Sequence, residues 1–303
     1  MQFNRFKAIL GALLGFYPFY YFAYKGRINY KTFELFLIVI IPIIILQFFY
    51  NQANYIDKFD NENVVNNVAY LFVLILPFLF LIRNRIIALT LLAVILYFVI
   101  QGAKRGALFA AGLGTMAFIY YIFKNIKFSS KIKRIRLYFT IFSGLLVVVY
   151  LGFKKLFENE FLLSRLDALS EGNTSNRTEI YATIFNFWYS TDNFMNFIFG
   201  FGFGSSLEIT GGYFAHNDWL ELLSNFGVIG VLIYLFLIFS TISYIRNNNH
   251  SLQNRMMLLS IVLIWFFMTM VSMWYTSLNT FLHAILLGYI YGNEARKKTF
   301  YKL

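Results

Sequence analysis

Long runs of apolar residues, separated by short polar connections, make up most of the 303-residue chain. A helix needs about 20 apolar residues to cross a bilayer, because each residue rises about 1.5 Å. The runs are continuous and do not alternate with polar residues, which favours spanning helices over the strands of a barrel. We therefore predict an all-α, polytopic transmembrane helical bundle. Its nine predicted spans cover residues 8–24, 33–50, 64–82, 86–101, 106–123, 137–153, 226–245, 256–275 and 277–292.

The amino-acid composition also indicates an integral membrane protein. Hydrophobic residues make up 59% of the chain, charged residues only 13%, and the mean hydropathy is +0.62. A soluble domain usually has about 45–50% apolar and roughly 25% charged residues, so ordinary soluble enzymes, disordered tails and disulfide scaffolds are excluded. The chain has no cysteine, which excludes disulfides, thiol catalysis and thiolate metal sites.

The net charge of +12 comes mostly from Lys and Arg in the short connections between apolar runs. Such residues set the orientation of a membrane protein, and they form no basic face of the kind that nucleic-acid binding needs. Basic groups follow the first, third, fifth and seventh spans, and a further group ends the chain. With nine spans, all of them lie on one side, which is predicted to be cytoplasmic. The N-terminus and the segments 51–63 and 154–225 are then outside.

Three regions follow from this topology. They are N-terminal transmembrane helices at 1–153, an extracytoplasmic loop at 154–225, and C-terminal transmembrane helices at 226–303. The loop is by far the longest connection. We expect function to reside there, because the remaining sequence is mostly lipid-facing or packing sequence.

The outer loop predicts three local structures. Residues 179–190 space their apolar side chains like one face of a helix, which would lie along the membrane interface. The Gly/Phe run at 199–206 predicts a tight, kinked turn. A second amphipathic helix begins near His216, with Asn217 or Asp218 as its cap, and runs into the seventh span.

Two groups of cationic residues could bind an anionic substrate. Lys104 and Arg105 lie at the outer end of the fourth and fifth spans, between small residues that would let a bulky group approach the backbone. Arg165 and Arg177 lie in the outer loop. Guanidinium groups grip phosphate oxygens bidentately, so these residues could together hold a diphosphate without metal. The alternative is snorkelling of the first pair to lipid headgroups and simple solvation of the loop arginines.

Histidine is rare in the chain, and His216 is the candidate for acid–base chemistry. It lies on the outer face at the start of a helix, where a neutral imidazole can accept a proton near neutral pH. The alternative is a capping or loop-packing histidine. His250 lies in a polar run on the cytoplasmic side and is predicted to be solvated, whereas His283, inside the ninth span, is predicted to pack between helices.

The acidic residues of the outer loop are scattered and predict no metal site. Asp218 and Glu221 share a helix face at i,i+3 spacing, but two carboxylates alone supply too few ligands for a metal ion. No Walker loop, dinucleotide fingerprint or Gly-x-Ser-x-Gly elbow occurs in the sequence. We therefore expect neither a metal nor another cofactor.

The order of several short motifs resembles that of one bacterial family. The motifs are Lys104-Arg-Gly-Ala107, Asn176-Arg-Thr-Glu-Ile-Tyr181, Gly200-Phe-Gly-Phe-Gly204, Ala215-His-Asn-Asp-Trp-Leu-Glu221 and Gly227-Val-Ile-Gly230. Each motif is loose alone. Together, over residues 100–235, they look like the O-antigen ligase and O-antigen polymerase superfamily of bacterial envelope glycan enzymes.

This resemblance implies an all-helical membrane glycosyltransferase of the class C kind, in the bacterial inner (plasma) membrane with its active site facing the periplasm or cell exterior. The donor would be an undecaprenyl-diphosphate-linked glycan, used without metal or nucleotide sugar. By motif position, Arg105 and Arg177 would bind the diphosphate and stabilise its charge, and His216 would activate the acceptor hydroxyl. Further candidates for substrate binding are Lys104, Arg165, Asn217 and Asp218.

Within the superfamily, the expected function is polymerisation of lipid-linked repeat units into O-antigen or capsular polysaccharide. The acceptor would then be a second lipid-linked glycan, and a chain-length regulator is a possible partner. The alternative is a ligase that transfers the glycan to lipid A-core or to protein, since the donor motifs are shared. A transporter of lipid-linked sugars is less favoured, because it predicts charged residues inside several spans, and the spans here are poor in charge.

The predicted topology departs from that of the superfamily. Its members commonly have more spans and keep both ends in the cytoplasm, whereas nine spans place this N-terminus outside. Loss of an odd number of spans from the N-terminal side would explain both differences. We therefore expect a short or N-terminally incomplete member.

Overall fold

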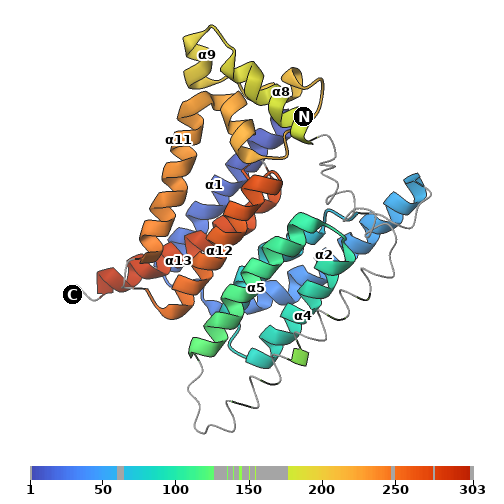
Figure 1. The fold of residues 1–303 in the computed structure, drawn as a ribbon. Coiled ribbons are helices and arrows are strands. Elements are labelled where there is room, and N and C mark those ends of the chain that lie inside the picture. Colours follow the sequence, from blue (N-terminus) through green and yellow to red (C-terminus); the bar gives the residue numbers. More distant parts are fainter. Residues whose placement is uncertain are drawn as a thin grey trace. The chain divides into compact units, whose positions relative to one another are not determined.

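The computed structural model of the protein describes residues 2–59, 65–125, 177–246, 250–275 and 277–300, with a few isolated positions between 135 and 154 (Figure 1). These residues form helices joined by short connections, and no strand occurs among them. The predicted all-α fold is confirmed for this part of the chain. The predicted span at 137–153, for the most part, and Arg165 lie outside the described residues.

The chain divides into two compact units. The first comprises Met1–Ile28, Gly172–Ser251 and Ile261–Leu303, and the second comprises Asn29–Glu171 and Leu252–Ser260. The first unit contains α1 (Gln2–Tyr24), α8 (Arg177–Tyr189), α9 (Phe194–Phe199), α10 (Ser205–Ile209), α11 (Asp218–Arg246), most of α12 (Leu252–Val271), η2 (Leu278–Thr280) and α13 (Phe281–Phe300). The second contains α2 (Tyr30–Phe59), α3 (Ala69–Ile75), η1 (Leu76–Leu81), α4 (Arg85–Gln101), α5 (Arg105–Asn125) and the start of α12.

Helices α1 and α13 of the first unit pack closely because glycines lie at their contact. Gly288 lies against the backbone carbonyl of Phe16 and Gly292 against that of Tyr20, so tightly that a Cβ at either glycine would collide. The rings of Phe16 and Tyr291 also meet edge to face, with their centroids 6.1 Å apart. This helix pair supplies part of the wall of an internal cavity.

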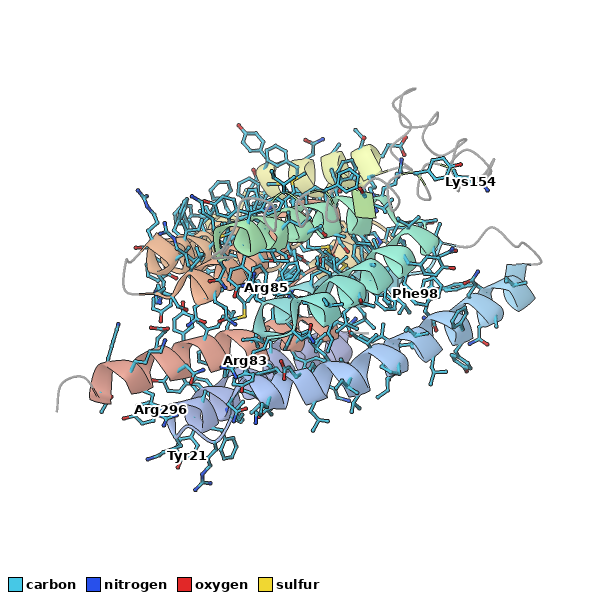
Figure 2. All side chains as sticks on the ribbon, turned by 90° about the horizontal axis from the view of Figure 1, so that it is seen from below. Tyr21, Arg83, Arg85, Phe98, Lys154 and Arg296 are labelled. Carbon is cyan, nitrogen blue, oxygen red and sulfur yellow. The ribbon has the colours of Figure 1, made fainter. Side chains whose placement is uncertain are left out.

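The second unit is built around an aromatic core. Phe72 and Phe98 stack with their ring centroids 5.0 Å apart, and Phe48 meets Phe98 edge to face at 5.2 Å. Phe98 lies toward the end of α4, away from Arg85 at its start (Figure 2). Asn66 ties the chain entering α3 to α2, since its Nδ2 donates to the carbonyl of Phe48 at 2.8 Å. Aromatic burial of this kind is a large contribution to the stability of a helical unit.

Four helices in the described part of the chain are long and apolar enough to cross a membrane. They are Tyr30–Ile56 within α2, together with α5, α11 and α12. They correspond to the predicted spans at 33–50, 106–123, 226–245 and 256–275. The chain therefore has the helices of a membrane protein, in agreement with its composition.

The structure corrects the predicted spans at 64–82 and 256–275. The run at 64–82 does not form one continuous α-helix, because α3 ends at Ile75 and the 3₁₀-helix η1 follows. Pro77 lies in the first turn of η1, where its ring nitrogen has no hydrogen to donate to an α-helical ladder. The run at 256–275 was also predicted too long, since α12 ends at Val271.

Candidate functional site

The predicted glycine turn at 199–206 is confirmed, and it packs against the N-terminal part of α11, at Ser224–Gly227. Gly200, Gly202 and Gly204 all have positive φ angles, of 76°, 99° and 89°. A Cβ added to Gly200 would lie 2.5 Å from the backbone of Asn225. The amide of Phe201 donates to the carbonyl of Ser224 at 2.8 Å. Only glycine allows both the backbone conformation and this close approach.

Three polar side chains of α11 form one buried face, which we name the α11 polar face. They are Asp218, Glu221 and Asn225, each no more than 1% exposed. Their i, i+3, i+7 spacing places them on one side of the helix. Charged residues are almost never fully buried unless they are paired, so the partners of these residues decide what the face does.

Asp218 binds the loop that follows α12. Its Oδ1 accepts a hydrogen bond from the amide of Trp274 at 2.9 Å, and its Oδ2 accepts one from the amide of Tyr275 at 3.2 Å. The hydroxyl of Tyr234 donates to Oδ2 at 3.1 Å. Asp218 is therefore engaged within the protein, and these bonds fix Trp274 and Tyr275 in the loop after α12.

Glu221 and Asn225 bind the two other loops that reach this end of α11. Glu221 accepts from the hydroxyl of Ser206 at 2.7 Å and from the amide of Ala215 at 2.9 Å. Asn225 accepts at Oδ1 from the amides of Gly204 and Ser205, at 3.0 and 3.1 Å, and its Nδ2 donates to the hydroxyl of Tyr275 at 2.8 Å. The α11 polar face thus fixes three loops at once.

Two residues singled out from the sequence meet at the C-terminal end of α12. The guanidinium of Arg177, at the start of α8, donates to the carbonyl of Val271 at 3.2 Å. The side-chain Nδ2 of Asn217, at the start of α11, donates to the neighbouring carbonyl of Met270 at 3.3 Å. The last carbonyls of a helix lack partners within it and favour a nearby cation. The end of α12 therefore gathers Arg177 and the segment that carries His216.

Asn217, rather than Asp218, caps α11. Its Oδ1 accepts hydrogen bonds from the amides of Trp219 and Leu220, at 3.0 and 3.3 Å. The sequence predicts either residue as the cap. The structure separates them, because Asn217 points back to the helix start while Asp218 is used by the loop after α12.

His216 is exposed and holds a rare backbone conformation. Its φ angle is +50°, and the only other non-glycine residue with positive φ in the described part of the chain is Ala103, at +51°. Such conformations cost about 1–3 kcal/mol and cluster at functional sites. One of these residues, His216, lies in the motif at 215–221, and the other, Ala103, lies directly before the motif at 104–107.

Lys104 and Arg105 lie in the second unit, at the start of α5, and both are partly buried. The turn before them is compact because Gly102 lies against Ala69. A Cβ added to Gly102 would lie only 2.6 Å from the Cβ of Ala69. The amide of Asn66 also donates to the carbonyl of Gly102 at 3.0 Å. Arg177 and His216, by contrast, belong to the first unit.

The prediction that His250 is solvated is wrong. Its imidazole side chain is only 2% exposed, its Nε2 lies 2.9 Å from the carbonyl of Tyr244, and its Nδ1 lies 3.7 Å from a carboxylate oxygen of Glu294. His283 lies where a packing residue was expected. It is 2% exposed, and its ring centroid is 4.8 Å from that of Trp274.

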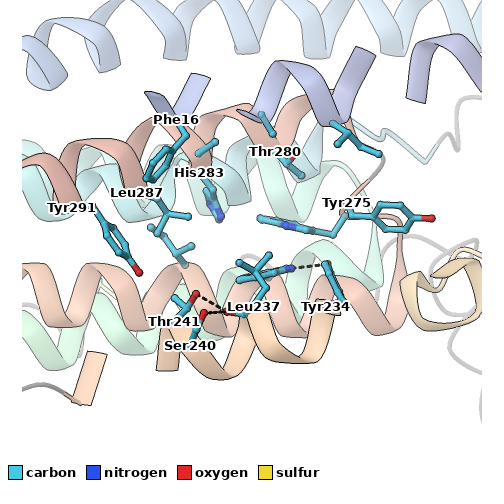
Figure 3. A pocket seen from close by; sticks show the side chains of 16 residues that line it. Phe16, Tyr234, Leu237, Ser240, Thr241, Tyr275, Thr280, His283, Leu287 and Tyr291 are labelled. Atoms are coloured by element: carbon cyan, nitrogen blue, oxygen red, sulfur yellow. Dashed lines mark hydrogen bonds between the residues drawn. The ribbon is translucent and has the colours of Figure 1, made fainter. Parts of the chain in front are cut away.

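A cavity of about 500 Å³ lies within the first unit, among α1, α11, α12 and α13 (Figure 3). Its walls are mostly apolar and aromatic. The indole of Trp265 donates to the hydroxyl of Tyr234 at 2.7 Å, and Tyr234 in turn binds Asp218. The cavity and the α11 polar face therefore share a wall, which consists of Tyr234, Trp274 and Tyr275.

The end of α12 brings together a cation, Arg177, and the backbone segment that carries His216. A guanidinium keeps its charge at any working pH and binds phosphate oxygens, and an exposed imidazole can exchange a proton. Within the described residues no group of three or more His, Cys, Asp or Glu side chains could hold a metal ion. No protein-family model, curated protein or solved structure matches the chain.

Proposed function

We propose that the protein is a membrane glycosyltransferase that polymerises undecaprenyl-diphosphate-linked repeat units into O-antigen or capsular polysaccharide. It would act in the bacterial inner membrane, with nine spans, a class C-like architecture and a site on the outer face. One observation carries the proposal. Arg177 and Asn217 both bind the last carbonyls of α12, and the neighbouring residue His216 is exposed and has a strained backbone.

The proposed reaction is a single displacement at the anomeric carbon of the donor sugar. His216 would accept the proton of the acceptor hydroxyl while that oxygen forms the new glycosidic bond. The bond between the anomeric carbon and the diphosphate oxygen breaks, and the configuration inverts. Because diphosphate is already a good leaving group, stabilisation of its developing charge by Arg177 and Arg105 matters more than a general acid.

The test is the length of the glycan ladder in cells that lack the gene, complemented with wild-type protein or with His216→Ala, Arg105→Ala or Arg177→Ala. We expect the ladder to be lost in each variant, since removing a general base or an oxyanion-stabilising cation costs about 10²–10⁴-fold in rate. Asp192→Ala, an exposed residue of the same loop region, serves as the control that should keep the ladder.

The pattern of the remaining glycan separates the alternatives. Single repeats still attached to lipid A-core support a polymerase. Loss of all attached glycan, with long chains left on the lipid carrier, would instead indicate a ligase. Wild-type ladders from all three variants, at wild-type expression, would contradict glycosyl transfer by these residues.

A further inference from the structure

A second cavity, of about 220 Å³, lies within the second unit where α4 begins and α5 ends. We name it the basic cavity. Its polar lining residues are Arg83, Arg85, Tyr121, Asn125 and Gln253, and none of its lining residues is acidic. Figure 2 shows Arg83 and Arg85 near the start of α4. A cavity with two guanidinium groups and no lining carboxylate favours an anion.

Both arginines are held in place by neighbouring groups. The guanidinium of Arg83 lies 4.3 Å from the ring centroid of Tyr30, and its Nη1 donates to the Tyr30 hydroxyl at 2.9 Å. The Nη2 of Arg85 lies 3.4 Å from the carbonyl oxygen of Asn125, at the end of α5. A guanidinium carries five N–H donors, so one such bond leaves donors for a ligand. Side chains already ordered lose less entropy on binding.

Two further features suit a negatively charged ligand. Arg85 is the first residue of α4, where the helix dipole favours negative charge, and the side chain of Asn84 already accepts from the amides of Ile86 and Ile87. The carboxylate of Glu34 accepts from the backbone amide of Arg83 at 2.9 Å. It is therefore bound to the backbone and does not line the cavity.

The volume and the position of the basic cavity limit which anions could bind there. At roughly 30 Å³ for each water molecule in the liquid, its volume equals about seven waters, which suits one phosphate group. A sugar nucleotide would need the 300–1,000 Å³ typical of larger ligand pockets. The cavity lies at the end of α5, a helix long and apolar enough to cross a membrane. The end of such a helix reaches the layer of lipid headgroups.

We propose that the basic cavity binds one phosphate group, supplied by the headgroup of an anionic membrane lipid. Binding would use the N–H donors of Arg83 and Arg85 and would fasten the ends of α4 and α5 to the headgroup layer. This proposal does not depend on glycosyl transfer, because the residues that carry it lie outside the proposed active site.

The experiment measures binding of dioctanoyl phosphatidic acid to the purified full chain in a neutral detergent, by the ligand-dependent rise in the unfolding temperature. Inorganic phosphate and dioctanoyl phosphatidylcholine are tested at the same concentrations. The variant Arg83→Gln/Arg85→Gln is compared with Arg27→Gln/Arg246→Gln, which removes the same charge from exposed arginines outside the cavity. Circular dichroism verifies the helix content of each protein before titration.

We expect phosphatidic acid to protect the wild type and the control variant, with at least a tenfold weaker dissociation constant in Arg83→Gln/Arg85→Gln. Each charged hydrogen bond contributes enough for about a tenfold effect. Should the Gln variant fail to fold, Arg83→Lys/Arg85→Lys keeps the charge but loses the planar fork, and we expect its binding to be measurably weakened. Equal protection of wild type and cavity variants overturns the proposal. Equal protection by inorganic phosphate overturns the lipid source.

Discussion

The α11 polar face and the end of α12 lie in one unit, yet they treat their polar groups in opposite ways. Asp218, Glu221 and Asn225 are buried and bind loops of the same chain. Arg177 is only partly buried, and His216 is exposed. Buried polar groups that bind several loops fix structure, whereas Arg177 and His216 keep part of their surface in contact with solvent. The difference separates the residues that hold the loops from the residues that are proposed to react.

The comparison is most sharply tested by Asp218→Ala. The substitution leaves the amides of Trp274 and Tyr275 and the hydroxyl of Tyr234 without their acceptor. Unsatisfied buried groups cost about 1–3 kcal/mol each, so we expect the free energy of unfolding to fall by about 3–5 kcal/mol. The midpoint of unfolding in detergent, followed by circular dichroism, measures the change.

The matched control is Asp192→Ala, because Asp192 is exposed. A surface substitution of this kind usually changes stability by less than about 0.5 kcal/mol. If Asp218→Ala unfolds with the same midpoint as Asp192→Ala, then Asp218 does not hold the loop after α12, and the division between holding and reacting residues fails.

A second test compares two glycines of the turn at 199–206. Gly200 combines a positive φ of 76° with a close approach to Asn225 and Phe226, whereas an added Cβ at Gly202, with φ of 99°, would meet nothing within 4 Å. We expect Gly200→Ala to cost about 2–4 kcal/mol, from strain and collision together. Gly202→Ala should cost less, about 1–2 kcal/mol, from strain alone. If the two variants lower the unfolding midpoint equally, then close contact between Gly200 and α11 does not contribute to stability.

Asn217 lies at the border of the two regions, since it caps α11 and also binds the end of α12. Asn217→Ala removes an N-cap, and we expect a loss of about 1 kcal/mol. Asn217→Asp keeps the capping oxygen and should lose less, although it no longer donates to the carbonyl of Met270. Thermal unfolding of both variants measures the difference. A larger loss in the Asp variant would show that the bond to α12 matters more than the cap.

Much of the fold could be predicted because helices, caps and glycine turns are encoded locally. The apolar runs gave the helices, the glycines of 199–206 gave the turn, and Asn217 was one of two candidates for the cap. The prediction failed where the end of a helix depends on contacts with residues that are distant in the sequence. α12 ends at Val271, and Asp218 binds the amides of Trp274 and Tyr275 in the loop that follows, whereas the sequence around Ser272 carries no strong stop signal.

The buried polar groups were harder to assign than the helices. Nothing in the sequence shows that Asp218, a candidate for substrate binding, also binds the loop after α12, or that His250 is buried, because partners such as Trp274 and Glu294 are far away in the sequence. One signal was nevertheless present. The polar positions 218, 221 and 225 share one face of a mostly apolar helix, and such a stripe indicates polar partners inside the protein.

The smallest expected effect concerns the strained backbone of His216. A glycine relieves a left-handed conformation that costs an L-residue about 1–2 kcal/mol, but it adds about 0.5–1 kcal/mol of chain entropy to be lost on folding. We therefore expect His216→Gly to be more stable than His216→Ala by about 0.5–1 kcal/mol, by their unfolding midpoints. Both lack the imidazole, so both should lose the glycan ladder equally. A less stable glycine variant would show that His216 is not strained, and a ladder restored by either variant would remove it from the proposed chemistry.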